Sequence, residues 1–512
     1  MPETADLLDN IAALKALLIA ATAREARKDE RIERLEKLVA AFRQAAFGRK
    51  SERADPDQFD LALEDLETAI ATIRAEEGAD VAPSKRASKP RAPNRGSLPG
   101  HLPRIEEVIE PESLICTCGG CLHCIGEDVS ERLDVVPAQF RVIITRRPKY
   151  ACRSCGDGVR QAPAPAHLIE GGIPTEATIA HVLVSKYADH LPLYRQAQIY
   201  SRQGIDLDRS TLADWVGKAA YELKPVFEAL IADLKCSSKL FMDETRAPVL
   251  DPGRRKTKTG YFWALARDDR PWGGEDPPGV AFTYAPGRSG QYAERILQGF
   301  TGVLQVDGYT GYNRLIGPER IGGDIRLAYC WAHARRKLYE VAQNATAPIA
   351  EEGLGRIAAL YQIEKDIAGL SAEARLAVRQ ARSKPLIANM ETWLVHHRAR
   401  VSPKAPLGEA LKYIAKYWDG LCLFLTDGRV EVDNNSVERS IRPIAINRKN
   451  ALFAGHDAGA ENWGVIASLV ETCKLNDVDP QAWLTNVLTR IVNGHKQSQI
   501  KDLLPWNYPV KV

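Results

Sequence analysis

The 512-residue sequence has no surplus of either charge and no long apolar run. Its 69 lysines and arginines and 66 aspartates and glutamates leave a net charge of +3, so any affinity for a polyanion must come from local patches. The nearest approach to a membrane segment, residues 11–23, is interrupted by Lys15 and is too short to cross a bilayer. The first residues also lack the basic start of a secretory signal. The sequence therefore predicts a cytoplasmic protein with no membrane association.

Cysteine is scarce outside one short cluster. Six of the ten cysteines lie between residues 116 and 155, and in an unexported chain such a cluster favours a metal over disulfides. Cys152 and Cys155 form one clear knuckle, because two thiolates from one tight turn can bind the same zinc ion. Four thiolates would leave no position for water, so the predicted zinc site is structural. The second knuckle stays open, between Cys118 with Cys121 and Cys121 with Cys124, with Cys116 and His123 as further donors.

The N-terminal part carries two patterns of its own. An apolar seam of period seven runs through residues 7–46. It predicts either a short coiled coil that joins protomers into a homo-oligomer or an amphipathic helix that packs on its own chain. Residues 78–104 are rich in proline and alanine and carry basic side chains that few acids accompany. This composition is typical of a segment that follows a phosphate backbone, and equally of a solvated tether.

Helical patterns enclose a group of strand-like runs. Periodic apolar residues predict helices over 177–188 and 193–202, a turn at Gly204 and a further helix capped by Asp208 or Ser210. This is a helix-turn-helix pattern, which ordinary helical hairpins share. Residues 333–428 and the stretches around Leu469 and Leu484 are again helical. A strand is expected over 141–145, and five more cover 239–242, 261–266, 280–284, 302–306 and 325–330, with a helix over 291–298 before the last two.

Three acidic residues stand out by their context. Asp243 ends the first of these five runs, Asp307 ends the fourth, and Glu438 lies in a polar stretch that begins at Asp433. Two Mg²⁺ ions need hard oxygen ligands on rigid elements, and three carboxylates are a common minimum for such a site. Glu244 is expected to point to the opposite face of the strand from Asp243. The alternatives are a plain strand-end acid, a turn before Gly308, and a capping box of Asn435 with Glu438.

Motifs along nearly the whole chain carry a resemblance to a known family. They are Phe47–Glu52, Ile125–Glu131, Arg147–Cys152, Met242–Thr245, Lys256–Gly260, Val306–Tyr309, Cys330–His333 and Val432–Asn435 with Arg442 and Pro443. The sequence resembles the DDE transposases of bacterial insertion-sequence family sixty-six. Residues from Leu469 on, with Cys473–Asp477, resemble the C-terminal tail of that family. One position departs from the family pattern, since Ile115 stands where the first zinc ligand is usual.

The resemblance implies a multidomain α+β protein with a ribonuclease H-like mixed α/β core and a helical insertion. Its DDE triad would fall on Asp243, Asp307 and Glu438, which would hold two catalytic Mg²⁺ ions. The expected function is binding of terminal inverted repeats followed by Mg²⁺-dependent strand cleavage and strand transfer into target DNA. Accessory proteins from the same element and a nucleoid location are also implied. The cysteine spacing, rather than the resemblance, predicts Cys118, Cys121, Cys152 and Cys155 as the ligands of the structural zinc, with Cys116 and Cys124 as possible substitutes.

The predicted division of the chain follows from these motifs. It is a coiled-coil region (1–77), a basic linker (78–104), a zinc ribbon (105–168), a helix-turn-helix-like region (169–235), the first part of the catalytic core (236–342), a helical insertion (343–428), the return of the core with the third acid (429–468) and a helical tail (469–512). The predicted DNA contacts are Arg335, Arg336, Lys337, Arg439, Arg442, Arg448 and Lys449.

Several hypotheses compete with these assignments. In one alternative, some of the basic residues lie on solvated helix faces and do not contact DNA. His333 would orient a phosphate, bind a metal or make a structural hydrogen bond. The rival function is a zinc-containing DNA-binding regulator without catalysis. A further alternative is a ribonuclease H-like repair nuclease, which would recognise DNA structure rather than particular ends.

Overall fold

The computed structural model describes residues 139–151, 159–251, 256–318, 320, 322–344 and 347–509, together with Lys15 and Thr22. The predicted coiled coil, the basic linker and the six clustered cysteines lie outside the described residues. The chain divides into two compact units, Met1–Pro148 and Lys149–Val512. In the first unit, residues 139–148 form neither helix nor strand, so the predicted strand over 141–145 is wrong. Its apolar side chains are exposed, because no neighbouring strand pairs with them among the described residues.

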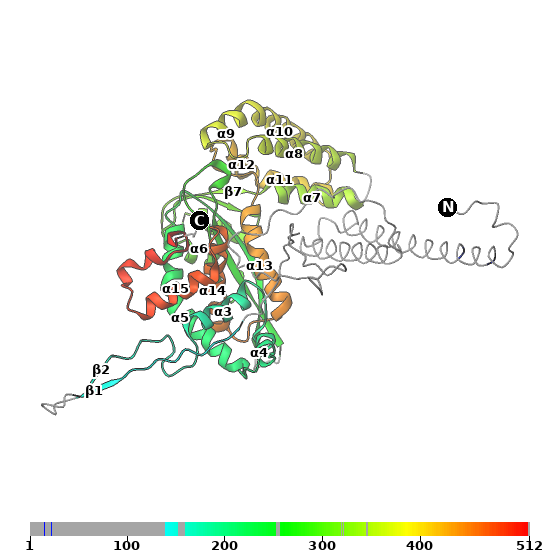
Figure 1. The fold of residues 1–512 in the computed structure, drawn as a ribbon. Helices are drawn as coiled ribbons and strands as arrows, with labels where there is room; N and C mark the ends of the chain where they lie inside the picture. Colours follow the sequence, from blue (N-terminus) through cyan, green and yellow to red (C-terminus); the bar gives the residue numbers. More distant parts are fainter. Residues whose placement is uncertain are drawn as a thin grey trace, which may run out of the picture. The chain divides into compact units, whose positions relative to one another are not determined.

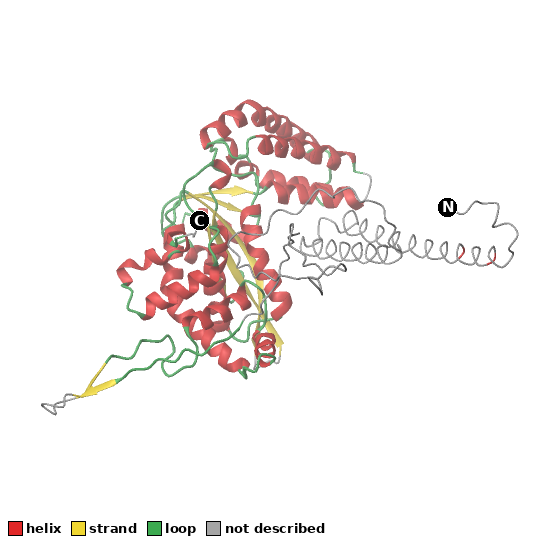
Figure 2. Ribbon diagram, in the orientation of Figure 1, coloured by secondary structure: helices red, strands yellow, loops and turns green. Residues whose placement is uncertain are grey.

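The second unit contains a five-stranded mixed sheet in the order β5-β4-β3-β6-β7. Its first three strands form an antiparallel meander, whereas β6 and β7 run parallel to β3. A separate short hairpin joins β1 (Lys149–Ala151) to β2 (Val159–Gln161). Figure 2 shows the sheet strands in yellow between red helices. The strands are β3 (Lys239–Asp251), β4 (Lys256–Arg267), β5 (Gly279–Ala285), β6 (Gly302–Val306) and β7 (Ile325–Tyr329).

The five predicted strands of the core are confirmed, but two are much longer than predicted, since β4 already begins at Lys256 rather than at residue 261. The strand β3 does not end at Asp243 but continues to Asp251, because its second half pairs with β4 up to the register Asp251 opposite Lys256. The pairing of β3 with β6 covers only Lys239–Phe241. Asp243 is therefore inside a strand, at the place where β3 leaves its parallel neighbour.

The predicted helices are confirmed as well. They include α3 (Glu176–Tyr187), α4 (Leu193–Ser201) and α5 (Arg209–Leu234), whose N-cap is Asp208, one of the two predicted candidates. Another is α6 (Gly290–Ile296) between β5 and β6, whereas α13 (Asn435–Ala451), which packs on β3 and β4, is not among the predicted ranges. The C-terminal helices are α14 (Asp457–Leu475) and α15 (Pro480–Val492). Among the described helices, none has the length and apolar composition to cross a bilayer.

Helix α14 covers the outer edge of the sheet. The backbone N–H of Val280 in β5 donates to Thr472 Oγ1 (3.2 Å), and the N–H of Phe282 donates to Ser468 Oγ (2.7 Å). An edge strand otherwise presents unpaired N–H groups to other chains. Gly464 permits the close approach, because a Cβ there would lie 2.6 Å from the carbonyl oxygen of Phe282.

Helices inserted after β7 gather beside that strand, at the opposite edge from α14 (Figure 1). One hydrophobic cluster, which includes Trp331 and Trp393, joins them to Val303 of β6 and Ala328 of β7. The insertion therefore packs on the sheet as part of the same unit. Its helices are α7 (Trp331–Asn344), α8 (Pro348–Asp366), α9 (Ala372–Val378), α10 (Lys384–Arg398), α11 (Pro406–Lys416) and α12 (Trp418–Leu421), with a π-helical turn over Arg379–Ser383.

Two buried arginines fix the insertion. Arg379 is fully buried and donates to both carboxylate oxygens of Glu364 (2.9 and 2.6 Å) and to the carbonyls of residues 424, 427 and 428. Arg375 bridges Glu364 (3.3 Å) and Glu431 (2.8 Å). Glu431 lies just before α13, so this network connects the insertion to the segment that carries the third acid.

We expect Arg379→Leu to lower the free energy of unfolding by about 3–5 kcal/mol, because it removes the closer partner of the buried Glu364 carboxylate and leaves buried carbonyls without their donor. Among the described residues, that carboxylate then keeps only its longer ion pair with Arg375. Urea denaturation followed by tryptophan fluorescence measures the change. The matched control is Arg382→Leu, which breaks an exposed ion pair with Asp366 and should change stability far less. Equal losses in the two variants would contradict the role assigned to the buried network.

Candidate functional site

The carboxyl ends of β3 and β6 bring two of the predicted acids together. Asp307 directly follows β6, and Asp243 lies just beyond the paired part of β3. Since the two strands are parallel, their ends open at the same edge of the sheet, where open α/β sheets usually bind ligands. Carboxylate oxygens of Asp243, Glu244 and Asp307 all lie within 4.8 Å of one another.

The position of Glu244 differs from the prediction. Strand alternation places its Cβ on the other face from that of Asp243, yet its carboxylate joins the same cluster. The cause is the side chain's length and the end of the β3–β6 pairing at Phe241, which lets the side chain reach across the strand edge. Its oxygens accept hydrogen bonds from Arg288 Nε (2.6 Å) and from the Tyr312 hydroxyl (2.7 Å), and the side chain is only 1% exposed.

The two aspartates are held by backbone donors. Asp243 Oδ1 accepts from the N–H of Glu244 (2.7 Å), and Asp307 Oδ1 accepts from the N–H of Tyr309 (2.9 Å). Burial, followed by the charges of Asp307 and Glu244, raises the pKa of Asp243 well above its usual range. Burial also raises the pKa of Glu244, although its hydrogen bond from Tyr312 opposes the shift. Close, buried and mutually repelling carboxylate oxygens are the donor set that fits a hard divalent cation such as Mg²⁺ or Mn²⁺.

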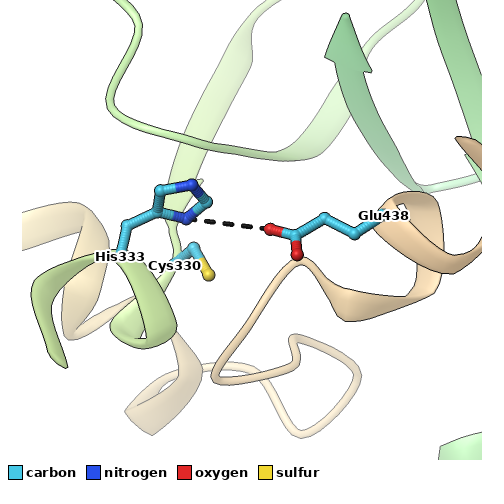
Figure 3. A group of neighbouring side chains, drawn as sticks. All are labelled: Cys330, His333 and Glu438. Atoms are coloured by element: carbon cyan, nitrogen blue, oxygen red, sulfur yellow. Dashed lines mark ion pairs between the residues drawn. The ribbon is translucent and has the colours of Figure 1, made fainter. Parts of the chain in front are cut away.

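The third predicted acid reaches this region from α13. Glu438 lies in the first turn of that helix, and its Oε1 is 3.9 Å from Nδ1 of His333 (Figure 3). Its charge contributes to the raised pKa of Asp243, and together with that of Asp307 it opposes the lowering of the His333 pKa by burial. The three acids and His333 therefore share one electrostatic neighbourhood, and within it Asp243 and Asp307 belong, with Glu244, to one cluster of carboxylate oxygens.

A capping box does not explain Glu438. The N-cap of α13 is Asn434, and Asn435 is already inside the helix. The side chain of Asn435 donates to Asp433 Oδ2 (2.7 Å) instead. Glu438 is thus available to the site rather than engaged in capping.

Hydrogen bonds from the strand ends fix the segment before α13. Gln305 of β6 donates to the carbonyls of Glu431 (3.0 Å) and Asp433 (3.2 Å) and accepts from the N–H of Glu431 (2.8 Å). The fully buried Asn434 donates through its side chain to the Met242 carbonyl (3.4 Å) and through its N–H to Cys330 Sγ (3.3 Å). These contacts set the start of α13 against β3, β6 and the end of β7.

Comparisons with known proteins match the sequence of most of this unit. A family model described as the Transposase IS66 family matches residues 171–462, which is more than half of the chain and includes all three acids. The chain belongs to the IS66 family of transposases.

Shorter models cover most of the rest of the transposase. The IS66 C-terminal element matches residues 468–506, the zinc-finger binding domain of transposase IS66 matches 113–156, and a model described as Transposase C of IS166 homeodomain matches 34–106. The zinc-finger match spans all six clustered cysteines, which supports zinc binding there.

Relatives of similar length come from Sinorhizobium fredii (strain NBRC 101917 / NGR234). The uncharacterized protein y4jD is 46% identical over 477 residues, which cover 92% of this chain and 93% of the relative. The uncharacterized protein y4qI is 43% identical over 535 residues, and 98% of each chain is covered. The uncharacterized protein y4hP is 39% identical over 490 residues, which cover 92% of this chain and 88% of the relative.

The structure divides the predicted DNA-contacting residues of the IS66 transposase into two groups. Arg336 and Lys337 of α7 and Arg439 and Lys449 of α13 are exposed. The other three, Arg335, Arg442 and Arg448, are partly buried.

Arg448 donates to the Arg246 carbonyl (2.6 Å), and burial lowers its pKa. It lines a hollow of about 510 Å³ beside the acid cluster, together with Glu244, Thr245, Arg246, Pro248, Tyr261 and Arg288.

Sequence reasoning missed four residues of the site. Glu244 was assigned to the wrong face, and Arg288, Tyr312 and Asn434 were not singled out. Tyr312 lies in the short 3-10 helix Thr310–Ile316 that follows Asp307. Its closeness to Asp307 in the sequence was the only feature that could have indicated its role. Arg288 and Asn434 act through contacts with residues far away in the chain, which leave no local pattern.

Asn434→Ala tests the link between α13 and β3. It removes the side-chain bond to the Met242 carbonyl and leaves a buried acceptor without its donor, so we expect a loss of about 1–3 kcal/mol in the free energy of unfolding. Urea denaturation of the metal-free protein measures it. Asn493→Ala removes an exposed side-chain bond to the Thr489 carbonyl and should be nearly neutral; a comparable loss there would weaken the assignment.

Asp243→Asn should stabilise the metal-free transposase at neutral pH. Folding raises the pKa of Asp243, so its contribution to stability is complete below pH 4 and is lost as the pH rises through the raised value. The uncharged amide avoids that loss. The melting temperature of the variant should therefore exceed that of the wild type by about 2–4 °C for each kcal/mol of repulsion that the substitution removes. The difference should disappear at pH 4, and Mg²⁺ should stabilise only the wild type.

Differential scanning calorimetry at several pH values measures this effect. The control is Asp206→Asn in the exposed turn before α5, which should change little at any pH. A variant less stable than the wild type at pH 7 without metal would contradict the repulsion inferred at Asp243.

Proposed function

We propose that this chain is the enzyme that cuts and joins the ends of an insertion sequence, with Asp243, Asp307 and Glu438 as its DDE triad. The observation that carries the proposal is the close approach of Asp243 and Asp307 at the ends of β3 and β6, with Glu438 of α13 near enough for its charge to act on Asp243, in a chain of the IS66 family. The strand order β5-β4-β3-β6-β7, with three antiparallel strands followed by two parallel ones, supports a ribonuclease H-like core. In this order the first acid lies on the central strand and the second on its parallel neighbour.

The triad would hold two Mg²⁺ ions. When bound, such a pair stabilises the charge on the attacking and leaving oxygens of an in-line phosphoryl displacement. Water attacks the phosphodiester at the element boundary, the P–O bond to the 3′ oxygen breaks, and a free 3′-hydroxyl remains. That hydroxyl then attacks a target phosphodiester and displaces a target 3′-hydroxyl, so that no protein–DNA bond forms.

The chain's own residues supply positioning. Backbone N–H groups fix one oxygen of Asp243 and one of Asp307, which orients both carboxylates before metal and DNA arrive. Arg288 and Tyr312 hold Glu244, so that its charge is partly balanced within the protein. The exposed cations of α7 and α13, Arg336, Lys337, Arg439 and Lys449, lie on the two helices whose first turns carry His333 and Glu438, and would contact the DNA backbone.

Other regions of the chain would recognise the two ends of the insertion sequence and bring them together. The helices α3 to α5 would act with the zinc ribbon in binding the terminal inverted repeats, and a coiled coil near the N-terminus would pair two protomers. Zinc in the ribbon, on Cys118, Cys121, Cys152 and Cys155, would be structural. Accessory proteins of the same element would take part in the full reaction.

Cleavage of a labelled DNA fragment that carries the border of the element tests the proposal. With Mg²⁺ or Mn²⁺ the wild type should cut at the boundary, and Asp307→Ala should reduce the rate by at least about 100-fold, since even groups that only support a metal ligand contribute 10- to 100-fold. Asp324→Ala, which alters an exposed acid before β7, should cut like the wild type. Specific binding without cutting, with accessory proteins present, would favour a DNA-binding regulator.

A further inference from the structure

Glu438, the third acid of the triad, also belongs to a second group of side chains that could bind a metal ion. Cys330 Sγ, one imidazole nitrogen of His333 and a carboxylate oxygen of Glu438 lie within 4.8 Å of one another. Cys330 immediately precedes α7, His333 lies in the first turn of α7, and Glu438 lies in the first turn of α13. Figure 3 shows the imidazole and the carboxylate facing each other, with the sulfur beside them.

One of these donors, Nδ1 of His333, lacks the hydrogen-bond partner that a purely structural role would provide. His333 Nδ1 is buried and has no hydrogen-bond partner within the part of the chain that the structure describes. The nearest acidic oxygen, on Glu438, is 3.9 Å away, which is too far for a hydrogen bond. The sulfur of Cys330 accepts the N–H groups of Asn434 (3.3 Å) and His333. Burial raises the pKa of the Cys330 thiol to about 12, and these two bonds to sulfur oppose the shift by favouring the thiolate that a metal would bind.

The chemistry of this group differs from that of the aspartate cluster. A thiolate, an imidazole and a carboxylate are the ligands that Zn²⁺ takes at about 2.3, 2.0–2.1 and 2.0–2.2 Å. Tetrahedral angles at those lengths place the ligand atoms about 3.4–3.6 Å apart. The His333–Glu438 pair, at 3.9 Å, would have to close by less than about half an ångström, and atoms at the 4.8 Å limit of the group by about 1.2–1.4 Å. Asp243, Glu244 and Asp307 offer only oxygen and suit Mg²⁺. The fourth zinc position would stay open.

We propose that Cys330, His333 and Glu438 form an inhibitory zinc site that competes for the third acid of the triad. When Glu438 binds zinc with Cys330 and His333, it is withdrawn from the Mg²⁺ site, and DNA cleavage stops. Zinc binding itself follows from the geometry of these three residues. The inhibition rests on the proposed function, because it requires Glu438 to be a catalytic ligand.

Zinc titration of the full-length chain tests the binding. The protein is first equilibrated with a weak chelator that leaves the tightly held zinc of the ribbon in place, and further zinc uptake is measured by competition with a chromogenic chelator. The wild type should bind one more zinc ion than Cys330→Ser and than His333→Gln, or bind it at least about 10- to 100-fold more tightly. Cys236→Ser, which alters an exposed cysteine at the end of α5, should match the wild type.

Cobalt provides a spectroscopic readout. Co²⁺ added after the ribbon is filled with zinc should produce a sulfur-to-cobalt charge-transfer band in the wild type, and this band should be absent in Cys330→Ser. Because Cys330 is buried and its replacement affects packing, the partly exposed His333 provides the second test, with thermal unfolding as a check on folding. Equal metal uptake and equal spectra in a folded His333→Gln variant and the wild type would overturn the zinc site.

Cleavage assays separate the two proposals. Zinc should inhibit the Mg²⁺-dependent reaction of the wild type and of Cys236→Ser, and excess Mg²⁺ should relieve the inhibition. If the variants lose zinc but the wild type never cuts DNA, the zinc site stands and the proposed function fails. If the wild type cuts DNA and remains active when the additional zinc site is filled, the inhibition is wrong and the transposase chemistry stands.

Discussion

The arrangement of the site depends on the hydrogen bonds that return the chain from the helical insertion to the sheet. Gln305, two positions before Asp307, bonds to the backbone on both sides of Val432, and the N–H of Trp331 donates to the carbonyl of Val432 itself (2.9 Å). Asn434 completes the connection with its bond to Met242, the residue before Asp243. The acid on α13 is thus positioned by groups adjacent to the other two acids.

Electrostatic repulsion among the acids has to be balanced elsewhere in the structure. Burial and neighbouring charges disfavour ionisation of Asp243, so the metal-free site lowers the stability of the fold at neutral pH. Packing of the insertion opposes this loss, because Arg375 binds Glu431 at the start of the returning segment. The insertion therefore does more than extend the surface, since its buried arginines hold the backbone that carries Glu438.

The sequence predicted the elements of the fold better than the contacts of the site. Apolar runs of limited length located the five core strands, and Asp208 located the start of α5. Alternation failed at Glu244, because it describes the direction of Cβ and not the reach of a long side chain. Asn434 and Arg288 were missed since their partners, Met242 and Glu244, are distant in sequence. The apolar residues 142–144 formed no strand, as a strand requires a neighbour as well as a propensity.

The three acids are not held equally. One oxygen of Asp243 and one of Asp307 accept backbone N–H bonds at their strand ends, whereas the described partner of Glu438 is the imidazole of His333 at 3.9 Å. A glutamate on the first turn of a helix has three side-chain torsions and no backbone anchor here, so it can reach either neighbouring donor group at small conformational cost. Its two sets of neighbours differ in chemistry, with oxygen alone on one side and nitrogen and sulfur on the other. The identity of the available metal ion would then determine which set Glu438 joins.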